Sequence, residues 1–385
     1  MRTVCGLDVH KDSVFMCILD SKGEKIEEKF STLTPDLDRM RDIMVEHGVQ
    51  EVAMESTSIY WMPVWNILES DFSLKLVNPL FIKQLPGRKT DVKDAHWIAT
   101  VLQKELIRGS YVPEHAIQEL RLIERRQADL RKKGVRVLQR IDEALQRCNI
   151  RLSNYVSDVE SKSMQKVIAA IICGERDGIK LARLVHGRTR NKYGMKVLVD
   201  SLTGCITPSV VFALAQLKEE LEMIRKHEEA CLKEMARLCM ELYAAEVELL
   251  DTIPGVAKQS AMTIIAELGV DLKMFATAAA LVGWLGLRPR NEESAGKIKS
   301  KKTMHGNKYL RVILVQCAWA AIREKGSRFK NKYNMLRKRM SPQKALIAIA
   351  RKLVLVIWNV LTKKEVYNPL LGHRPALVSQ HNIVR

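Results

Sequence analysis

Residues 3–20 read TVCGLDVHKDSVFMCILD, and this stretch decides the fold that we expect for the N-terminal region. Two apolar runs, TVCGLDV (3–9) and SVFMCILD (13–20), stand on either side of the turn-prone HKD. Runs of this kind joined by a short polar turn are typical of antiparallel strands. A third run, KIEEKFST (25–32), follows the turn-prone SKGE. The sequence therefore predicts three successive antiparallel strands.

Helical and strand-like segments alternate after the third strand. We predict a helix over residues 35–47, a buried strand at EVAMES (51–56) and a helix over SIYWMPVWNILES (58–70). Another strand at LKLVN (74–78) precedes a helix that starts at Asp91. Three antiparallel strands followed by alternating helices and strands form an α/β domain with a mixed central sheet.

Four acidic residues stand where these predicted elements begin or end. Asp8 lies at the end of the first strand and Glu55 at the end of the fourth. Asp91 and Asp94 stand three residues apart at the start of a helix, so their carboxylates share one helix face. Capping and the helix dipole alone also explain two acids in a first helical turn.

Together the four acids indicate a metal site. Functional groups gather at the carboxyl ends of strands in an open α/β sheet, so carboxylates from distant parts of the chain can converge there. Carboxylates that lie close together need cations between them, and a pair of Mg²⁺ ions in such a cage supports phosphodiester chemistry. The placement is typical of the ribonuclease H-like fold.

The middle of the chain is predicted to be helical. One charged helix is expected over residues 118–152, and a longer one over residues 211–249 carries apolar residues at alternating spacings of three and four. This heptad seam fits an antiparallel hairpin within one chain and a coiled coil between subunits equally well. Residues 153–210 are predicted as a loop or an insertion. The seam consists of Leu214, Leu217, Leu221, Ile224, Cys231, Met235, Leu238 and Leu242.

Positive charge is concentrated near the C-terminus. Residues 288–364 hold 21 Lys and Arg residues against three acids, a net charge of +18 out of +19 for the whole chain. Such a field is typical of a protein that binds a polyanion. A solvated basic face on an inert domain is the alternative. Aromatic residues interleave with the charge, namely Trp319, Phe329, Tyr333 and Trp358.

Two motifs lie close to this basic segment. LLDTIPGVAKQSAMTIIAELG (249–269) is similar to a helix-hairpin-helix, whose glycine-rich turn can bind a phosphate, but simple helix packing explains it equally well. NEESAGKIKSKKTMHGNKYLR (291–311) places Ser294 before a small-residue turn among many cations. A serine nucleophile needs activation and cations that hold its target phosphate. Ser294 is otherwise a loop serine, and Ser300 is its local competitor.

Length and composition set further limits. A chain of 385 residues is long enough for two or three domains. No apolar run approaches the roughly 18 residues of a membrane span, and no signal-peptide pattern is present. The eight cysteines form no C-x-x-C pair, which argues against a zinc site or a disulfide framework. We expect a cytoplasmic protein that is not bound to a membrane.

Several motifs together resemble one family. GLDVHKDSV, MESTSIYW, VNPLFIKQLPGRKTDVKDA, LVGWLGLRPRNEESAGK and MHGNKYLRVIL are similar to motifs of the DEDD-type insertion-sequence transposases, also described as bridge-RNA-guided recombinases. The resemblance covers nearly the whole chain and is weak between residues 150 and 210. It implies a bacterial, nucleoid-associated enzyme that binds donor and target DNA and acts as a dimer or tetramer.

The resemblance also assigns roles to residues. It implies an N-terminal domain similar to the Holliday-junction resolvase RuvC, in which Asp8, Glu55, Asp91 and Asp94 bind Mg²⁺, or Mn²⁺ as a substitute. It implies that Ser294 forms a covalent phosphoserine with DNA, in a site shared between the acidic domain of one subunit and the serine domain of another. The family usually has two glycines after this serine, whereas Ala295 stands at the first of these positions. A structured guide RNA is implied by the resemblance alone.

We therefore expect three regions and one main function. The regions are a RuvC-like α/β domain (1–112), a helical coiled-coil region (113–248) and a basic, mainly helical domain with the catalytic serine (249–385). The main alternative function is a metal-dependent, structure-selective endonuclease of the Holliday-junction type, without a covalent intermediate. A sugar-kinase or actin-like ATPase lacks support because Val9-His10-Lys11 does not supply their phosphate loop. A non-catalytic scaffold leaves the acids unexplained.

Overall fold

The fold is taken from a computed structural model that describes residues 2–20, 22–79, 82, 94–107, 109–289, 292–294, 297–300 and 303–369. Of residues 292–294 and 297–300 it describes the backbone. The chain forms two compact units, Met1–Pro113 and Glu114–Arg385. The predicted site residue Asp91 lies outside the described residues.

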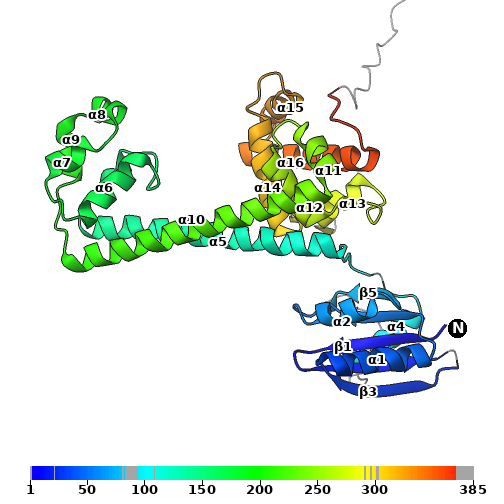
Figure 1. Ribbon diagram of the computed structural model, residues 1–385. Helices are drawn as coiled ribbons and strands as arrows, with labels where there is room; N and C mark the ends of the chain where they lie inside the picture. The colour runs from blue at the N-terminus through cyan, green and yellow to red at the C-terminus, as the bar shows by residue number, and fades with distance from the viewer. Residues whose placement is uncertain are drawn as a thin grey trace, which may run out of the picture. The chain divides into compact units, whose positions relative to one another are not determined.

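The first unit contains a five-stranded sheet in the order β3-β2-β1-β4-β5 (Figure 1). Strand β2 pairs antiparallel with both β1 and β3, whereas β4 pairs parallel with both β1 and β5. This is the mixed sheet that the sequence predicts. The strands are β1 (Val4–Val9), β2 (Ser13–Leu19), β3 (Lys25–Ser31), β4 (Glu51–Glu55) and β5 (Ser73–Val77).

Helices cover both faces of this sheet. Side chains of a strand point alternately to the two faces, so neighbouring residues enter different cores. Leu7 and Met54 pack in the core with α1 and α2, whereas Val4 and Ala53 pack in the core with α4. The helices are α1 (Thr34–Glu46), α2 (Trp61–Leu68) and α4 (Asp94–Gln103).

Gly6 explains why α4 can lie so close to the sheet. A Cβ atom at this position would stand 2.3 Å from the carbonyl oxygen of Ala95 and 2.4 Å from the backbone nitrogen of Ala99. Backbone atoms cannot move out of the way as a flexible side chain can, so only glycine permits this crossing. The contact fixes the first turns of α4 above the middle of β1.

Two long helices form the frame of the second unit. Helices α5 and α10 lie side by side and antiparallel (Figure 1). The predicted hairpin within one chain is therefore present. Of the predicted seam, Leu214, Leu221, Ile224 and Met235 are buried. At its C-terminal end, however, Cys239 is buried in place of Leu242, which is 49% exposed. A helix with 3.6 residues per turn drifts from a strict seven-residue repeat, which explains the change. The helices are α5 (His115–Arg147) and α10 (Pro208–Leu242).

Residues 153–210, predicted as a loop or an insertion, instead form a small helical lobe. The lobe shares one apolar core with the C-terminal half of α5 and the N-terminal half of α10. The basic piece HGRTRNKYG contributes a short helix rather than a loop. The elements are η1 (Leu152–Asn154), α6 (Lys162–Ile172), α7 (Gly178–Arg183), α8 (Gly187–Tyr193) and α9 (Met195–Ser201).

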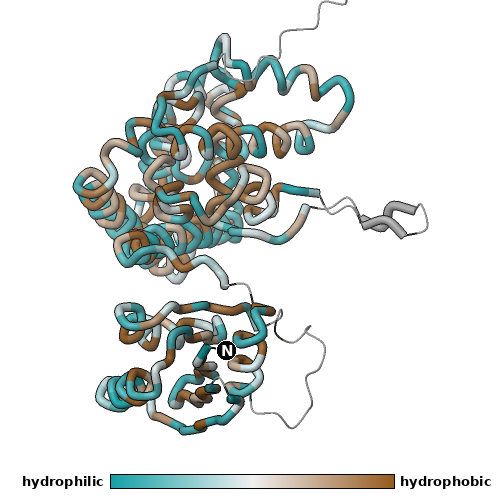
Figure 2. Tube along the Cα trace, turned by 90° about the vertical axis from the view of Figure 1, so that its right-hand side faces the viewer, coloured by the Kyte–Doolittle hydropathy of each residue, from teal (hydrophilic) through white to brown (hydrophobic). Residues whose placement is uncertain are grey.

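The opposite ends of α5 and α10 join a larger helical domain. Its hydrophobic residues gather inside, with hydrophilic positions on the outer turns (Figure 2). A two-stranded sheet, β6 with β7, is inserted between α13 and α14. The elements are α11 (Ala244–Asp251), α12 (Lys258–Leu268), α13 (Ala278–Trp284), β6 (Glu292–Ser294), β7 (Lys297–Ser300), α14 (Lys308–Ala321), α15 (Arg328–Arg337) and α16 (Pro342–Lys363).

Helix α16 departs from the expectation that no segment is long and apolar enough to span a membrane. Its 22 residues meet that test by length and composition. Half of its most apolar window is buried inside the fold, and residues such as Ile349, Leu353 and Ile357 belong to the main core of the helical domain. A helix that is apolar on most of its faces also forms when it packs at the centre of a helical domain.

Candidate active site

The register of two parallel strands brings the first two predicted acids together. Val4 pairs with Glu51 and the register continues to Leu7 with Met54, so the next step along both strands sets Asp8 beside Glu55. Leu7 and Met54 face the α1/α2 core. Since successive side chains alternate between faces, Asp8 and Glu55 share the opposite face, under α4. Both are half-buried.

Helix α4 carries Asp94 toward the same edge of the sheet. The C-terminal end of α4 is fixed by Gln103, whose amide donates a 2.8 Å hydrogen bond to the carbonyl oxygen of Asp20. Asp20 follows Leu19, which pairs with Val4 at the start of β1. The N-terminal end of α4, where Asp94 stands, therefore points toward the end of β1 that holds Asp8. A carboxylate in this first turn is also stabilised by the helix dipole.

His10 is a neighbour of Asp8 that had no predicted role in the site. Its Nε2 atom lies 3.0 Å from Oδ2 of Asp8, and its ring packs edge-on against Phe15 with the centroids 5.8 Å apart. The Nζ atom of Lys29 stands 5.1 Å from the centroid of the same Phe15 ring. Asp8 pairs with Phe15, and Phe15 with Lys29, across three strands. Lys29 thus lies two strands from Asp8 in the same row across the sheet.

The donor set at this edge fits a hard divalent cation in its chemistry. Asp8, Glu55 and Asp94 offer carboxylate oxygens, which Mg²⁺ and Mn²⁺ prefer. Asp91, the fourth predicted ligand, lies outside the described residues. In the part of the chain that the structure describes, no three His, Cys, Asp or Glu side chains are close enough together to hold a metal ion. The described acids supply an open edge of the predicted site rather than a closed cage.

Ser294, for which a loop serine was the alternative interpretation, is the last residue of strand β6. Its register partner is Lys297, the first residue of β7, while Ser300 pairs with Glu292 at the other end of the hairpin. The two candidate serines therefore stand at opposite ends of one short hairpin. Since Ala295 and Gly296 alone separate the strands, Ser294 lies next to the connection.

The base of this hairpin is held by tight backbone packing. Pro289 and Thr303 form an isolated antiparallel bridge. A Cβ atom at Gly306 would stand 2.4 Å from the backbone nitrogen of Gly286, and Gly286 itself has a φ of +66°. Arg311 adds a 2.8 Å hydrogen bond from its Nη2 atom to Oγ1 of Thr303. These contacts explain why the GLRP and MHGN pieces need their glycines.

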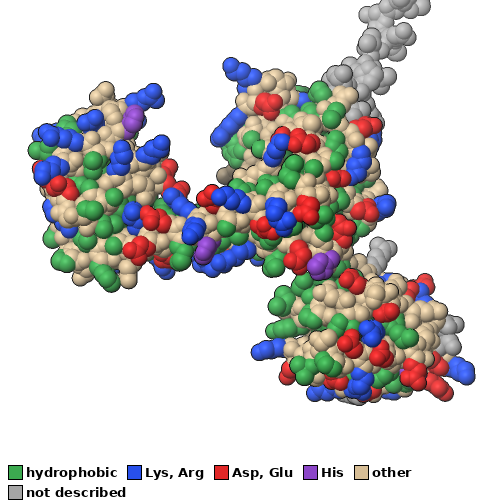
Figure 3. Space-filling model, viewed as in Figure 1, with side chains coloured by type: hydrophobic (Ala, Val, Ile, Leu, Met, Phe, Trp, Pro, Cys, Tyr) green, Lys and Arg blue, Asp and Glu red, His purple; other side chains and the backbone are tan. Residues whose placement is uncertain are grey.

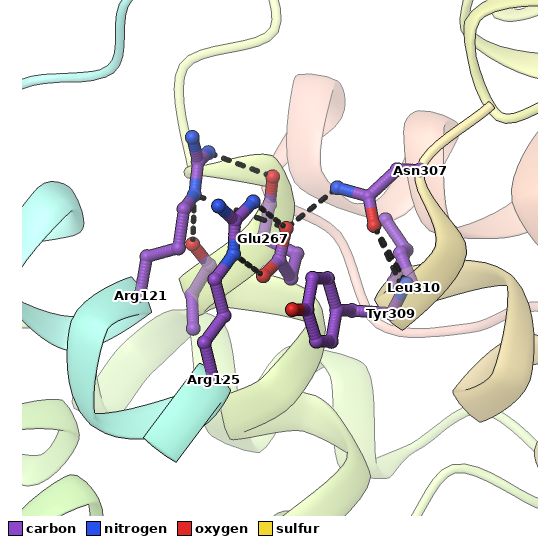
Figure 4. A network of polar contacts seen from close by, with 7 residues as sticks. Arg121, Arg125, Glu267, Asn307, Tyr309 and Leu310 are labelled. Carbon is purple, nitrogen blue, oxygen red and sulfur yellow. Dashed lines mark hydrogen bonds and ion pairs between the residues drawn. The ribbon is translucent and has the colours of Figure 1, made fainter. Parts of the chain in front are cut away.

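A buried ionic cluster anchors the helix that follows the hairpin (Figure 4). The Glu267 side chain is fully buried, and Arg125 donates to both of its carboxylate oxygens at 2.8 and 3.0 Å. The amide of Asn307 donates to the same carboxylate at 2.5 Å. The Asn307 side-chain oxygen in turn accepts hydrogen bonds from the backbone N–H groups of Tyr309 and Leu310, which caps α14.

Two carboxyl groups of this cluster have opposite pKa shifts. Burial raises the pKa of Glu124 from 4.5 to about 7, and the charge of neighbouring Glu267 adds to the rise. Burial also acts to raise the pKa of Glu267, but hydrogen bonds from Arg125 and Asn307 outweigh it and keep that pKa below its usual value. Ionising two close carboxylates costs free energy, so Glu124 rather than Glu267 binds the proton.

Cations surround the exposed side of the cluster. Arg125, Lys132 and Lys308 all stand over the ring of Tyr309, at 4.9, 5.3 and 5.1 Å from its centroid. Further Lys and Arg side chains, interspersed with Asp and Glu, lie along the α5 and α10 helices and over the helical domain (Figure 3). This arrangement fits a nucleic-acid backbone.

The predicted helix-hairpin-helix is explained by packing. Gly255 has a φ of +83°, and a Cβ atom there would stand 2.4 Å from the carbonyl oxygen of Cys317 and 2.5 Å from the nitrogen of Ala321. The glycine therefore lets the turn between α11 and α12 press against α14. Of the two alternatives for residues 249–269, the structure favours helix packing.

Comparisons with known proteins agree with these features. A transposase family model of the DEDD type matches residues 5–150, and a model described as the transposase IS116/IS110/IS902 family matches residues 247–334. A probable family 20 transposase of Pseudomonas aeruginosa is 24% identical over 379 residues, which cover 95% of each chain.

Two further relatives are transposases by name. The transposase for insertion sequence element IS1111A of Coxiella burnetii is 23% identical over 372 residues, which cover 94% of this chain and 91% of the relative. A putative transposase of Sinorhizobium fredii is 30% identical over 151 residues, 37% of this chain and 39% of the relative. The family matches bracket the helical lobe and include both the acidic sheet and the serine hairpin, so this chain belongs to the DEDD-type insertion-sequence transposases.

Proposed function

We propose that this transposase cleaves and rejoins DNA with two groups of residues, the carboxylates Asp8, Glu55, Asp91 and Asp94 and the hydroxyl of Ser294. The observation that carries the proposal is the shared position of Asp8, Glu55 and Asp94 at one edge of a ribonuclease H-like sheet. These acids come from three elements that are distant in sequence. Their placement at one edge of the sheet is explained if they serve chemistry on a phosphodiester.

The carboxylates would hold Mg²⁺, or Mn²⁺ in its place. When bound, such ions withdraw charge from the phosphate and stabilise the oxygens that attack and leave. The protein's own part is to fix the ligand positions. Asp8 and Glu55 are fixed by the ladder between β1 and β4, and Asp94 by the packing of α4 over Gly6.

Ser294 would act as the nucleophile. Its hydroxyl oxygen attacks the phosphorus atom and loses its proton, and the bond from phosphorus to the 3′ oxygen breaks. The leaving 3′ oxygen keeps the electron pair and takes up a proton. The new phosphoserine conserves the energy of the phosphodiester for the reverse attack by another 3′ hydroxyl, which rejoins the strands. The end of a short hairpin, held at its base, suits a group that must enter a DNA duplex.

Cations near the hairpin would hold the substrate. Lys308, Lys132 and Arg125 gather at Tyr309, directly after the hairpin. By the family resemblance, a structured guide RNA selects the DNA, and two or more subunits assemble so that the acids of one act with the serine of another. The α5 and α10 helices offer extended surfaces for such assembly.

The test is to trap the reaction on labelled DNA, denature the protein, and map the modified peptide by mass spectrometry. We expect an adduct on Ser294 that Ser294→Ala removes together with strand exchange. Ser300→Ala is the matched control, since it changes the other serine of the same hairpin, and it should keep the adduct. An adduct on Ser300, or efficient strand exchange without an adduct, would contradict the proposal and favour a metal-dependent nuclease that uses water.

A mixing experiment tests the shared site. Asp8→Ala and Ser294→Ala subunits are each expected to be inactive alone. If the acids of one subunit act with the serine of another, mixed assemblies contain an intact site and regain part of the activity. Mixtures that stay inactive, although they assemble, would place acids and serine of the same subunit together.

A further inference from the structure

A groove in the helical domain lies outside the candidate active site. It runs between α15 and α16, is closed on one side by residues 365–368, and has a volume of about 820 Å³. Sites of about 300–1,000 Å³ commonly bury a small organic ligand. The groove is thus large enough for about one or two nucleotide units.

The wall of the groove beyond α16 is firmly held. The ring of Tyr367 stacks on Phe329, with the centroids 6.2 Å apart and an angle of 22° between the planes. The backbone N–H of Tyr367 donates a 2.9 Å hydrogen bond to Oγ1 of Thr252. Arg328 donates from Nη1 to the carbonyl oxygen of Pro369, also at 2.9 Å. The segment that follows α16 is therefore a built part of the site.

Positive charge dominates the lining. Arg328, Lys332, Lys352 and Lys363 line the groove, and Glu365 is the one carboxylate among its lining residues. Within the described residues, no carboxylate lies within ion-pair distance of any of the three lysines. Burial lowers the pKa of Lys352, and the charges of Lys332, Arg328 and Arg351 lower it further. Lysines that stand close to other cations are stabilised by an anionic ligand.

The floor between these cations is apolar. Leu355 and Val356 are half-buried in it, while Met335 and Val366 remain 57% and 63% exposed at its rim. A simple anion gains no binding energy from contact with an apolar surface. Planar bases do, because they stack on or lie against apolar and aromatic side chains while their phosphates meet cations.

We propose that this groove binds a single-stranded segment of nucleic acid, with phosphates on Lys332, Lys352 and Lys363 and a base against Leu355, Val356 and Val366. A duplex presents phosphates and sugars on its outside and keeps its bases stacked, so it cannot use the floor. The inference rests on the proposed function as a nucleic-acid enzyme. Unpaired RNA and unpaired DNA share this chemistry, and the experiment separates them.

The groove variant is Lys332→Gln with Lys352→Gln. Its control is Lys325→Gln with Lys338→Gln, which removes the same charge from exposed residues at the two ends of α15 that do not line the groove. Binding of the full-length proteins is measured by fluorescence anisotropy with labelled oligo(U), oligo(dT) and a duplex of equal length. Thermal unfolding verifies that both variants keep their fold.

We expect the groove variant to lose at least tenfold more affinity for single strands than the control variant does. For the duplex, the two variants should lose affinity equally. The slope of log K against log salt for single strands should fall by about 1.4, from two lost phosphate contacts at about 0.7 each. Tighter binding of oligo(U) than of oligo(dT) would identify RNA as the ligand, and the reverse would identify a DNA strand. Equal single-strand affinity in groove variant and control would overturn the inference.

A second measurement tests the floor directly. An oligonucleotide that carries 5-iodouracil is cross-linked by light and the modified peptides are mapped. Cross-links to Tyr367 or to the residues of α15, α16 and 365–368 that line the groove support base binding, whereas cross-links confined to elements outside the groove count against it. Polyglutamate of equal charge that competes as well as oligo(U) would also overturn it, because charge alone would then suffice. Strand exchange by the wild-type protein is assayed in parallel, so that failure of the proposed function is recognised separately.

Discussion

The chain contains two carboxylate sites that are built in opposite ways. At the edge of the N-terminal sheet, Asp8 remains 15% exposed and its neighbour His10 is an exposed side chain. In the helical domain, the Glu267 side chain is fully buried; Arg125 of the same unit balances its charge, and Asn307 donates a hydrogen bond to it. Under the proposed function the first site receives a cation from solution, whereas the second has a cation of its own in Arg125. The source of the compensating charge would then distinguish a catalytic acid from a structural one.

The largest effect should follow from changing the sheet edge. Asp8→Asn keeps the shape of the side chain but removes the charge that would hold a metal ion. We expect strand cleavage to fall by roughly a thousandfold or more, about 4 kcal/mol in activation free energy, with little change in the unfolding temperature. Cleavage of labelled donor DNA with Mg²⁺ measures the loss.

Asp12→Asn provides the control for that substitution. Asp12 is an exposed residue of the turn that follows β1, and its loss should leave cleavage nearly unchanged. Wild-type cleavage in EDTA should be as weak as that of Asp8→Asn. Undiminished cleavage by Asp8→Asn, or by the wild type in EDTA, would mean that the acids serve the fold instead.

The buried cluster should show the opposite behaviour, a loss of stability. Arg125→Ala leaves the Glu267 carboxylate buried without its main partner. Breaking a fully buried pair costs about 3–5 kcal/mol of unfolding free energy, and since Arg125 is itself 44% exposed we expect a loss of about 2–3 kcal/mol. Urea denaturation gives the value. Arg126→Ala, an exposed neighbour on α5, should cost less than about 1 kcal/mol. Similar small losses for both would remove the contrast between the two carboxylate sites.

Glu124 adds a pH dependence to the same cluster. Its pKa of about 7 in the folded protein stands above its ordinary value of 4.5. The folded state thus binds the proton more tightly, and this contribution to stability is complete below pH 4.5 and is lost as the pH rises to about 7. The full amount is on the order of 3 kcal/mol.

Glu124→Gln mimics the protonated form at every pH. The variant should match the wild type near pH 5 and exceed it in unfolding free energy at pH 8, by up to about 3 kcal/mol. Unfolding curves at several pH values between 5 and 8 provide the measurement. A difference that is the same at all these pH values would show that Glu124 does not titrate in this range.

Local sequence patterns were sufficient to predict the sheet, and with it the positions of Asp8 and Glu55 at the ends of β1 and β4. Each strand shows its own alternation, and the parallel pairing of β1 and β4 follows from their order, so the meeting of the two acids could be foreseen. His10 was quoted in a motif but had no predicted role, because its contact with Asp8 depends on the geometry of the turn. The roles of Asp8, Glu55, Asp91, Asp94 and Ser294 remain predictions, and Asp91 and the side chain of Ser294 also lie outside the described part of the chain.

The helical domain was harder to predict because its contacts are distant in sequence. Arg125 and Glu267 are 142 residues apart, and no local pattern connects them. The one available signal was a single glutamate inside the apolar run SAMTIIAELG, since a buried acid needs a partner. The lobe at residues 153–210 was missed for another reason. Its helices are short and take their stability from α5 and α10, so their own periodicity is weak.

The smallest expected effect is a difference in stability between two variants of Asn307, the residue that joins the cluster to the hairpin. Asn307→Ala removes both the cap of α14 and the hydrogen bond to Glu267, whereas Asn307→Ser can still cap but cannot reach Glu267. Loss of a cap costs about 1 kcal/mol, and a hydrogen bond to a charged group is worth about 1.5–3 kcal/mol. We therefore expect the unfolding free energy from urea denaturation to be about 1 kcal/mol lower for Asn307→Ala than for Asn307→Ser. Equal stabilities would mean that Asn307 acts only through Glu267. If strand exchange falls further than stability predicts in both variants, Asn307 positions the hairpin that carries Ser294 as well as stabilising the fold.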